Sequence, residues 1–249
     1  NGTEQKPYLI SNVEHFNNIK FRMTKDPKNN TYYFGTVIDG VTTLEKEITT
    51  ETTTQYCFKQ TASIVITKNG DVDQTLNTIE TEFDGIYNGD YYSLTLDYTH
   101  IEQTADFSSI SIFNTISKNA TVKNLKLFFS IVSTDTNGVF YGDGGKVANI
   151  NLLCQENNGT ITNIVIGDKS QTIQLTSRDL VVVMSFIANN NNGLISNVQN
   201  NYNVQIEDAY RNNQRNIQFA SLVINNYSRV EYVKNNGSID ITGSNISVG

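Results

Sequence analysis

The sequence predicts an all-β fold built from stacked parallel strands, preceded by one short helix. Three observations lead to this prediction. Ile, Val, Tyr, Phe and Thr are plentiful, whereas strong helix formers are scarce. A strand-only unit of the form apolar–x–Asn–apolar recurs along the chain. The copies lie at spacings between about 20 and 50 residues, which is the range of solenoids and propellers. Together these features favour a right-handed parallel β-helix (β-solenoid) with a short N-terminal capping helix.

Length and charge narrow the function classes. The 249 residues can bury a sizeable core, and Asn makes up about 14% of them, far above ordinary usage. The net charge is −7 and the chain has no Lys/Arg cluster, which argues against nucleic acid and against an anionic membrane surface as partners. No apolar run approaches the roughly 18–20 residues of a membrane span. We therefore expect no nucleic-acid partner and no membrane insertion.

The N-terminus carries a helix signal. Ser11 and Glu14 have the spacing of a capping box, with Ser11 as the N-cap. Val13, Phe16 and Ile19 follow at helical spacing, which predicts a helix over residues 12–19. Because the open end of a β-helix exposes a row of unpaired backbone groups, we expect residues 1–30 to form an N-terminal cap.

The remainder is expected to form the coil, as one β-helix domain over residues 1–249. Residues 31–110 contain the alternating stretches Thr31–Ile38 and Ser63–Thr67 and a polar run over Thr49–Gln55, which predict irregular first turns with loop insertions. Residues 111–249 are expected to form regular turns. The alternation persists to Val248, and we interpret the chain as a fragment of a longer protein.

The recurring unit predicts the size of a turn. Each copy begins at an aromatic residue or Leu and ends in apolar–x–Asn–apolar. Four copies, each given by its first residue and its Asn position, are Phe113 with Asn124, Phe140 with Asn149, Phe186 with Asn197, and Leu222 with Tyr232 in place of Asn; a half-copy spans Thr160–Ile164. The interval from Phe140 to Phe186 fits two turns of about 23 residues, with two or three short strands per turn.

The repeats also predict which side chains stack. The residue two positions before each Asn is apolar and is expected to point inward, in a column of Val122, Val147, Ile161 and Ile195. The asparagines form a second predicted column of Asn124, Asn149, Asn163 and Asn197. Amide-to-amide hydrogen bonds would satisfy them if they point inward at a corner. Such a ladder would fix the vertical register, since a slip of one residue turns every side chain to the other face.

Several segments resemble one known group of proteins. The opening Gly2–Ser11, the Phe-Asp-Gly-x-x-Asn-Gly turn at Phe83–Gly89, and the units Thr121–Leu125 and Gly193–Val198 are similar to segments of GLUG-motif β-helical surface proteins. This group includes bacterial adhesin-like proteins and the N-terminal regions of some IgA-specific metalloendopeptidases. The Gly-Leu-x-Gly heart of the motif is degraded here to Gly138–Gly142. The resemblance implies an exported, cell-surface or secreted bacterial protein with a role in attachment or presentation.

Acidic residues are the candidates for catalysis, because many β-helices cleave polysaccharides with clustered carboxylates. Most of them adjoin Gly or Asn, the usual composition of solvated turns, and no compact acidic motif accompanies them. The candidates are Asp84, Asp90, Asp97, Asp135, Asp143, Glu156 and Asp168. We therefore expect no catalytic residue and no cofactor.

Metal and phosphate motifs are incomplete. Asp135–Gly138 begins like a calcium loop, but its twelfth position is Lys146 instead of Glu. Gly142–Gly145 lacks the Lys-Ser/Thr of a phosphate loop and is interpreted as a tight turn. Two cysteines and two histidines do not make a zinc site at a familiar spacing. Whether Cys57 and Cys154 are free thiols or one disulfide stays open.

Four tyrosines leave two interpretations open. Tyr87, Tyr91, Tyr92 and Tyr98 lie close together in sequence. Exposed rings can stack on sugars or anchor a protein partner, but alternating aromatic residues are also ordinary on a strand face.

The expected function is a noncatalytic, extracellular, adhesin-like binding or presentation module on a cell surface. Its partner would be a protein or glycan of the host or of a cell surface, and the module is expected to be a monomer in isolation. The first alternative is a polysaccharide lyase or glycoside hydrolase of the β-helix type. A further alternative is the stalk of a surface protease or of a phage or virus receptor-binding fibre.

Overall fold

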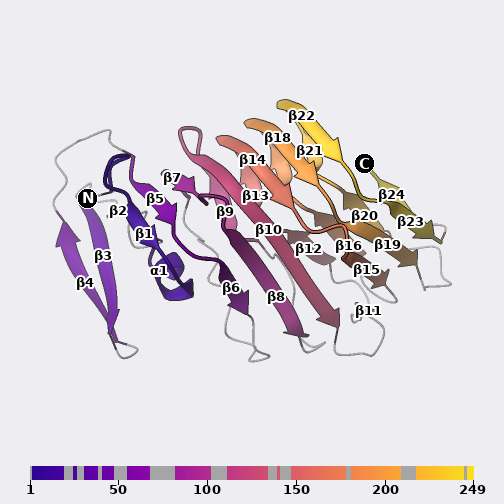
Figure 1. Cartoon of the computed structure of the whole chain (residues 1–249), viewed down its shortest axis with the longest axis horizontal. Helices are drawn as coiled ribbons and strands as arrows, with labels where there is room; N and C mark the ends of the chain where they lie inside the picture. Colours follow the sequence, from indigo (N-terminus) through magenta and orange to yellow (C-terminus); the bar gives the residue numbers. More distant parts are fainter. Residues whose placement is uncertain are drawn as a thin grey trace.

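Parallel strands stack into a coil along most of the chain (Figure 1). The structure is a computed structural model, and it describes residues 2–19, 25–26, 31–38, 41–47, 55–67, 82–101, 111–133, 139–140, 147–177, 181–208, 217–243 and 246–249. Within these residues the chain is almost entirely β-strand, with one short helix near the N-terminus. The predicted parallel β-helix is confirmed.

One long sheet runs the length of the coil. Its strands, in spatial order, are β1 (Tyr8–Ile10), β5 (Cys57–Gln60), β7 (Ile86–Asn88), β10 (Thr121–Ser133), β14 (Thr160–Ile166), β18 (Leu194–Asn200) and β22 (Arg229–Asn235). In addition, β8 (Ser93–Ile101) pairs with β10, and β6 (Ile64–Thr67) pairs with β8. All of its pairings are parallel. Each strand on the path from β1 to β22 therefore marks one passage of the chain around the coil, and β6 and β8 continue the passages of β5 and β7.

Three shorter sheets complete the turns from β10 onward. The second sheet contains β11 (Val139–Phe140), β15 (Thr172–Ser177), β19 (Asn203–Asp208) and β23 (Ile239–Thr242). The third contains β12 (Val147–Asn151), β16 (Val181–Ser185), β20 (Ile217–Ala220) and β24 (Ile246–Val248). The fourth contains β9 (Phe113–Ile116), β13 (Cys154–Asn157), β17 (Ala188–Asn191) and β21 (Val223–Asn226). The chain passes through the four sheets in this order and then returns to the long sheet.

A turn is longer than the sequence indicated. Equivalent residues of successive turns lie 39, 34 and 35 residues apart, so the prediction of 23-residue turns with two or three strands was wrong. The error arose because β12 of the third sheet matches the Asn motif, so that residues 140–150 were counted as an extra copy. Phe140 lies in the second sheet and Phe113 in the fourth. Residues 140–150 are therefore not a repeat copy, whereas Thr160–Ile164 belongs to a full one.

Buried apolar columns fill the interior. Phe58, Tyr87, Val122, Ile161 and Ile195 occupy consecutive positions across the long sheet and are all nearly inaccessible. Burial of one such aliphatic side chain stabilises the fold by about 1.5–3 kcal/mol. The predicted column is confirmed except for Val147, which pairs with Val181 in the third sheet.

The N-terminal helix is shorter than predicted. α1 spans Val13–Asn17, and its N-cap is Asn12, whose side chain accepts a hydrogen bond from the His15 amide. The assignment of Ser11 as N-cap was therefore wrong, and the Ser11 hydroxyl lies 3.0 Å from His15 Nδ1 instead. Phe16 and Ile19 are fully buried. Phe16 packs edge-on against Tyr87 of the long sheet, so the helix covers the interior of the first turns.

Part of the N-terminal region lies outside the coil. β2 (Lys25–Asp26), β3 (Thr31–Ile38) and β4 (Val41–Glu47) form a separate antiparallel sheet, drawn at the left of Figure 1. Thr31–Ile38, which the sequence analysis placed among the irregular first turns with loop insertions, is a strand of this separate sheet. Asp39-Gly40 separates β3 from β4 in sequence, and this pair is a strong hairpin signal. Of the polar run at 49–55, only Gln55 lies within the described residues.

Candidate binding surface

A ladder of asparagines follows one corner of the coil. Asn163 Nδ2 donates to Asn124 Oδ1 at 3.0 Å, and Asn197 Nδ2 donates to Asn163 Oδ1 at 2.7 Å. Asn124 in turn donates to Asn88 Oδ1 of β7 at 3.0 Å. We call Asn124, Asn163 and Asn197 the corner ladder. It confirms the predicted amide stacking for three of the four asparagines.

The backbone explains why Asn occupies this corner. The three residues have φ of 55–56°, a left-handed conformation that Asn tolerates better than most side chains. Each is skipped by the strand register, because Val122 pairs with Ile161 and Leu125 pairs with Ile164. The skipped residue lets apolar positions three apart both face the interior. The corner thus joins two straight strand segments without losing the core.

Two parts of the ladder prediction were wrong. Asn149 lies in β12 of the third sheet opposite Val183, and not in this column. The corner side chains are also half-buried or exposed instead of pointing into the core. The left-handed residue turns its side chain outward, so the ladder is a surface feature.

A second ladder, buried at Asn157 and Asn191 and exposed at Asn226, was missed by the sequence analysis. Asn157 Nδ2 donates to Asn191 Oδ1 at 2.7 Å, and Asn191 Nδ2 donates to Asn226 Oδ1 at 2.8 Å. Asn157 Oδ1 also accepts a hydrogen bond from the backbone amide of Gly159, and Asn191 Oδ1 accepts one from that of Gly193. We call Asn157, Asn191 and Asn226 the inner ladder. Its sequence signal is Asn-x-Gly/Ser just before β14, β18 and β22, at intervals of 34 and 35 residues.

A third column runs on the outside next to the inner ladder. Asn192 Nδ2 donates to Asn158 Oδ1 at 3.0 Å and to Glu156 Oε1 at 3.2 Å. In the last turn the equivalent position is Tyr227, since Asn191 pairs with Asn226. The corner ladder ends in the same way, because Tyr232 takes the left-handed position above Asn197 with φ of 54°. Tyr227 and Tyr232 are 72% and 78% exposed.

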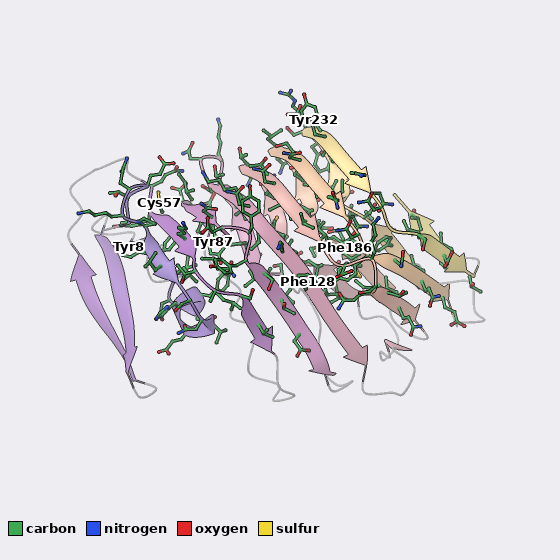
Figure 2. All side chains as sticks on the ribbon, in the orientation of Figure 1. Tyr8, Cys57, Tyr87, Phe128, Phe186 and Tyr232 are labelled. Carbon is green, nitrogen blue, oxygen red and sulfur yellow. The ribbon has the colours of Figure 1, made fainter. Side chains whose placement is uncertain are left out.

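These two outer columns define one surface. We call residues 158–163, 192–197 and 227–232 the ladder face; it is the outer side of β14, β18 and β22 together with the turns that lead into them. Between the columns the outward positions carry Thr162, Ser196 and Glu231 in one row and Thr160, Leu194 and Arg229 in the other. Figure 2 shows Tyr232 pointing away from the ribbon at the edge of the last turn.

The four tyrosines of the sequence analysis do not form one cluster. Tyr87 is fully buried and its hydroxyl donates to Gln60 Oε1 at 2.9 Å, so it is a core residue whose pKa burial raises strongly. Tyr91 and Tyr92 are 59% and 39% exposed. Asp90 and Tyr91 both have positive φ and the Tyr92 amide donates to the Gly89 carbonyl, which is the geometry of a type I′ turn. Tyr98 lies in β8, with its side chain outside the described residues.

The candidate carboxylates are held in separate local structures. Asp84 accepts a hydrogen bond from Ser117 Oγ, Asp90 pairs with Lys59 at 3.0 Å, and Asp168 Oδ1 accepts the Ser170 amide at 3.0 Å. Glu156 accepts from Asn192 in the third column. Asp97 lies in β8. Asp135 and Asp143 lie outside the described residues.

The register gives the strand carboxylates neutral neighbours. Glu156 lies between Thr115 and Asn190 across the fourth sheet. Asp97 lies between Thr67 and Ser130. Among the described strands, neither residue therefore has a carboxylate directly opposite it on an adjacent turn, where a glycosidase pair could be placed.

The cysteines are free thiols. Cys57 lies in β5 and Cys154 in β13, and both are buried. Burial, with a smaller contribution from Glu156, raises the pKa of Cys154, and burial, followed by Glu4, raises the pKa of Cys57. A raised pKa keeps a thiol protonated and unreactive at neutral pH.

No group of three or more His, Cys, Asp or Glu side chains suited to a metal ion occurs among the residues that the structure describes. The Asp135–Gly138 and Gly142–Gly145 segments lie outside those residues. The described helix is far too short to cross a bilayer.

Comparisons with known proteins give no relative. No family model, no curated protein and no solved structure matches the chain.

Proposed function

We propose that this chain is a noncatalytic binding or presentation module of the adhesin type, which acts at a cell surface or outside the cell. The ladder face carries the proposal. It combines two exposed tyrosines with uncharged hydrogen-bonding side chains on a rigid scaffold, and exposed aromatic residues with nearby polar groups are typical of recognition surfaces. The resemblance to GLUG-motif surface proteins supports the proposed location.

The rigidity of the scaffold also favours presentation. Successive turns are joined by backbone pairing in four sheets and by stacked amides that set their register. Such a coil holds surface groups at fixed intervals, so that several weak contacts can act together. A partner of this module would be a glycan or a protein on a host or on another cell.

A polysaccharide lyase or hydrolase is the second candidate. Its reaction needs acidic side chains that lie together within a few ångströms of the bond to be cleaved. The separate hydrogen bonds of Asp84, Asp90 and Asp168 favour the binding module over this reading. A stalk of a larger surface protease or of a phage or virus fibre is the third candidate.

A single set of incubations separates the candidates. The purified chain is tested on a glycan array and on immobilised cell-surface proteins, and is incubated with polyuronides and neutral polysaccharides. The proposal predicts saturable binding with no new reducing ends and no rise in absorbance of unsaturated uronates. Product release that a carboxylate-to-amide variant abolishes would show an enzyme, and absence of any binding would favour the stalk.

A further inference from the structure

We propose that the ladder face binds a neutral oligosaccharide, with one sugar ring stacked on Tyr232 and another on Tyr227. This inference rests on the proposed function and names the ligand class for it. It is argued from the hydrogen-bonding capacity, the charge and the aromatic residues of the face.

The amide columns leave regular hydrogen-bonding capacity on the surface. A primary amide has two N–H donors and a carbonyl oxygen with two lone pairs, and one rung of the corner ladder uses one donor and one lone pair. Asn163 and Asn197 therefore each retain a donor and an acceptor site beyond the ladder. Oδ1 of Asn197 receives no amide from the last turn, because Tyr232 occupies that position. Sugar hydroxyls, which both donate and accept, match this alternation.

The centre of the face adds hydroxyl groups. Ser196 Oγ donates to Thr162 Oγ1 at 2.9 Å between the two columns. Each hydroxyl has one donor and two lone pairs, so the pair keeps acceptor capacity toward solvent. Leu194 lies in the neighbouring row and is half-buried, offering an apolar contact to the C–H side of a ring.

The charge of the face favours a neutral ligand. Arg229 and Glu231 carry the charges on the outward positions of this surface, and they pair with each other at 2.6 Å. The remaining outward residues are amides, hydroxyls, Leu194 and the two tyrosines. An anionic polysaccharide or nucleic acid would need uncompensated cations here, whereas a neutral sugar chain needs none.

The backbone at Tyr232 makes an aromatic residue costly there. A non-glycine residue in the left-handed region costs on the order of 1–2 kcal/mol, and Asn or Gly avoids much of it. Asn fills this position in the three preceding turns, yet the last turn carries a Tyr that is 78% exposed and contributes little to the core. Retained strain at an exposed position is typical of functional sites. Tyr227 ends the parallel column with similar exposure.

The dimensions suit a short chain. Adjacent strands lie about 4.8 Å apart, so the three turns of the face extend over about 10 Å between their first and last strands. Tyr91 lies at the other end of the corner, four strands away, at roughly 19 Å. A ligand of about three sugars on the ladder face would not reach it.

Titration with defined oligosaccharides tests the inference. The intact chain is titrated with neutral hexose and pentose trisaccharides and with matched oligouronates, by calorimetry or by ligand-observed NMR. Tyr232→Ala and Tyr227→Ala are expected to weaken binding of a neutral trisaccharide about tenfold each, as expected for loss of one stacked ring. Tyr91→Ala is the matched control, because Tyr91 is also exposed and also has positive φ; its affinity is expected to stay within about twofold.

Each outcome decides between the inference and the proposed function. Preferential binding of oligouronates, binding of a protein but no glycan, or equal losses in Tyr91→Ala and Tyr232→Ala would overturn the inference and leave the binding module standing. Cleavage of any tested glycan would overturn the proposed function itself. Unchanged thermal unfolding of the three variants shows that any loss of affinity is local.

Discussion

The first and last turns of the coil are held together by different means. Around β5 and β7 the interior is a cluster of rings, in which Phe16, Phe83, Tyr87 and Phe113 have centroids 4.9–6.1 Å apart. Around β14, β18 and β22 the interior is mainly aliphatic, with one smaller ring cluster of Phe186, Tyr202 and Phe219. There the turns are also joined by stacked amides. Amides can stack only where equivalent residues of successive turns stay in register, and the corner ladder keeps that register across intervals of 39 and 34 residues.

This difference shows how one sheet tolerates both irregular and regular turns. Aromatic rings are large and fill irregular space, so the first turns can contain insertions and a helix without leaving voids. The amide ladders are specific, because each Asn must meet its equivalent one turn away. Regular turns therefore gain a fixed register, and irregular turns gain freedom in loop length.

The largest expected effect lies in the aromatic cluster. Phe113 is fully buried and contacts Phe16, Phe83 and Tyr87. Phe113→Ala is expected to lower the free energy of unfolding by about 3–5 kcal/mol, the usual cost of a Phe cavity. Urea unfolding followed by circular dichroism measures it. A loss below about 1 kcal/mol would mean that the cluster does not hold the first turns.

The inner ladder is expected to give the next largest effect. Asn191→Ala removes three hydrogen bonds at once. They are the bonds of the Asn191 side chain with the Asn157 side-chain amide, with Asn226 Oδ1 and with the Gly193 backbone amide. Because these groups are buried or half-buried, the expected loss is about 2–3 kcal/mol. Asn192→Ala, the exposed neighbour, is the control and should cost about 0.5 kcal/mol or less. Equal losses in the two variants would refute a special role of the inner ladder.

Alkaline pH is expected to weaken both regions through buried tyrosines. Burial raises the pKa of Tyr202 to about 12. The hydrogen bond with the backbone of Phe129 lowers this pKa, and the charge of Asp168 adds a smaller increase. An unfolded Tyr ionises near pH 10, so the unfolded state releases its proton first and stability falls as pH rises from about 10 to 12. Tyr202→Phe should show a shallower decline in urea midpoint over this range. An identical decline would assign the effect to other groups.

The smallest expected effect has the opposite sign. Tyr232→Asn restores an amide above Asn197 and relieves the left-handed conformation of a Tyr. The free energy of unfolding of this variant is expected to be higher than that of the original chain by about 0.5–1 kcal/mol. Tyr232→Ala, which keeps the strain and adds no amide, serves as the control. If Tyr232→Asn is no more stable than Tyr232→Ala, the corner ladder does not contribute to stability.

The sequence predicts the fold better than the size of its turns. Val122, Ile161 and Ile195 could be aligned because each precedes an Asn at a fixed distance. Asn149 matched the same local pattern but belongs to another sheet, since a four-residue pattern does not report which side of the coil it occupies. This match in the third sheet was counted as an extra copy, and the turn length was underestimated for that reason.

The candidate surface was only partly predictable. The sequence pointed to tyrosines as binding residues, but the group that it indicated, around residues 87–98, includes Tyr87, which is buried. Tyr227 and Tyr232 were not singled out as binding residues, because their significance depends on which residues lie beneath them. Only the register shows that each stands at the end of an amide column.

The central claim is that residues 34 positions apart, such as Thr162 and Ser196, lie side by side on adjacent turns. It is tested most directly by oxidising the double variant Thr162→Cys with Ser196→Cys and mapping the cross-link by mass spectrometry. The stacked coil predicts an efficient intramolecular disulfide between these positions and none in the double variant Thr162→Cys with Ala148→Cys, which lie in different sheets. A cross-link in the second variant and none in the first would contradict it.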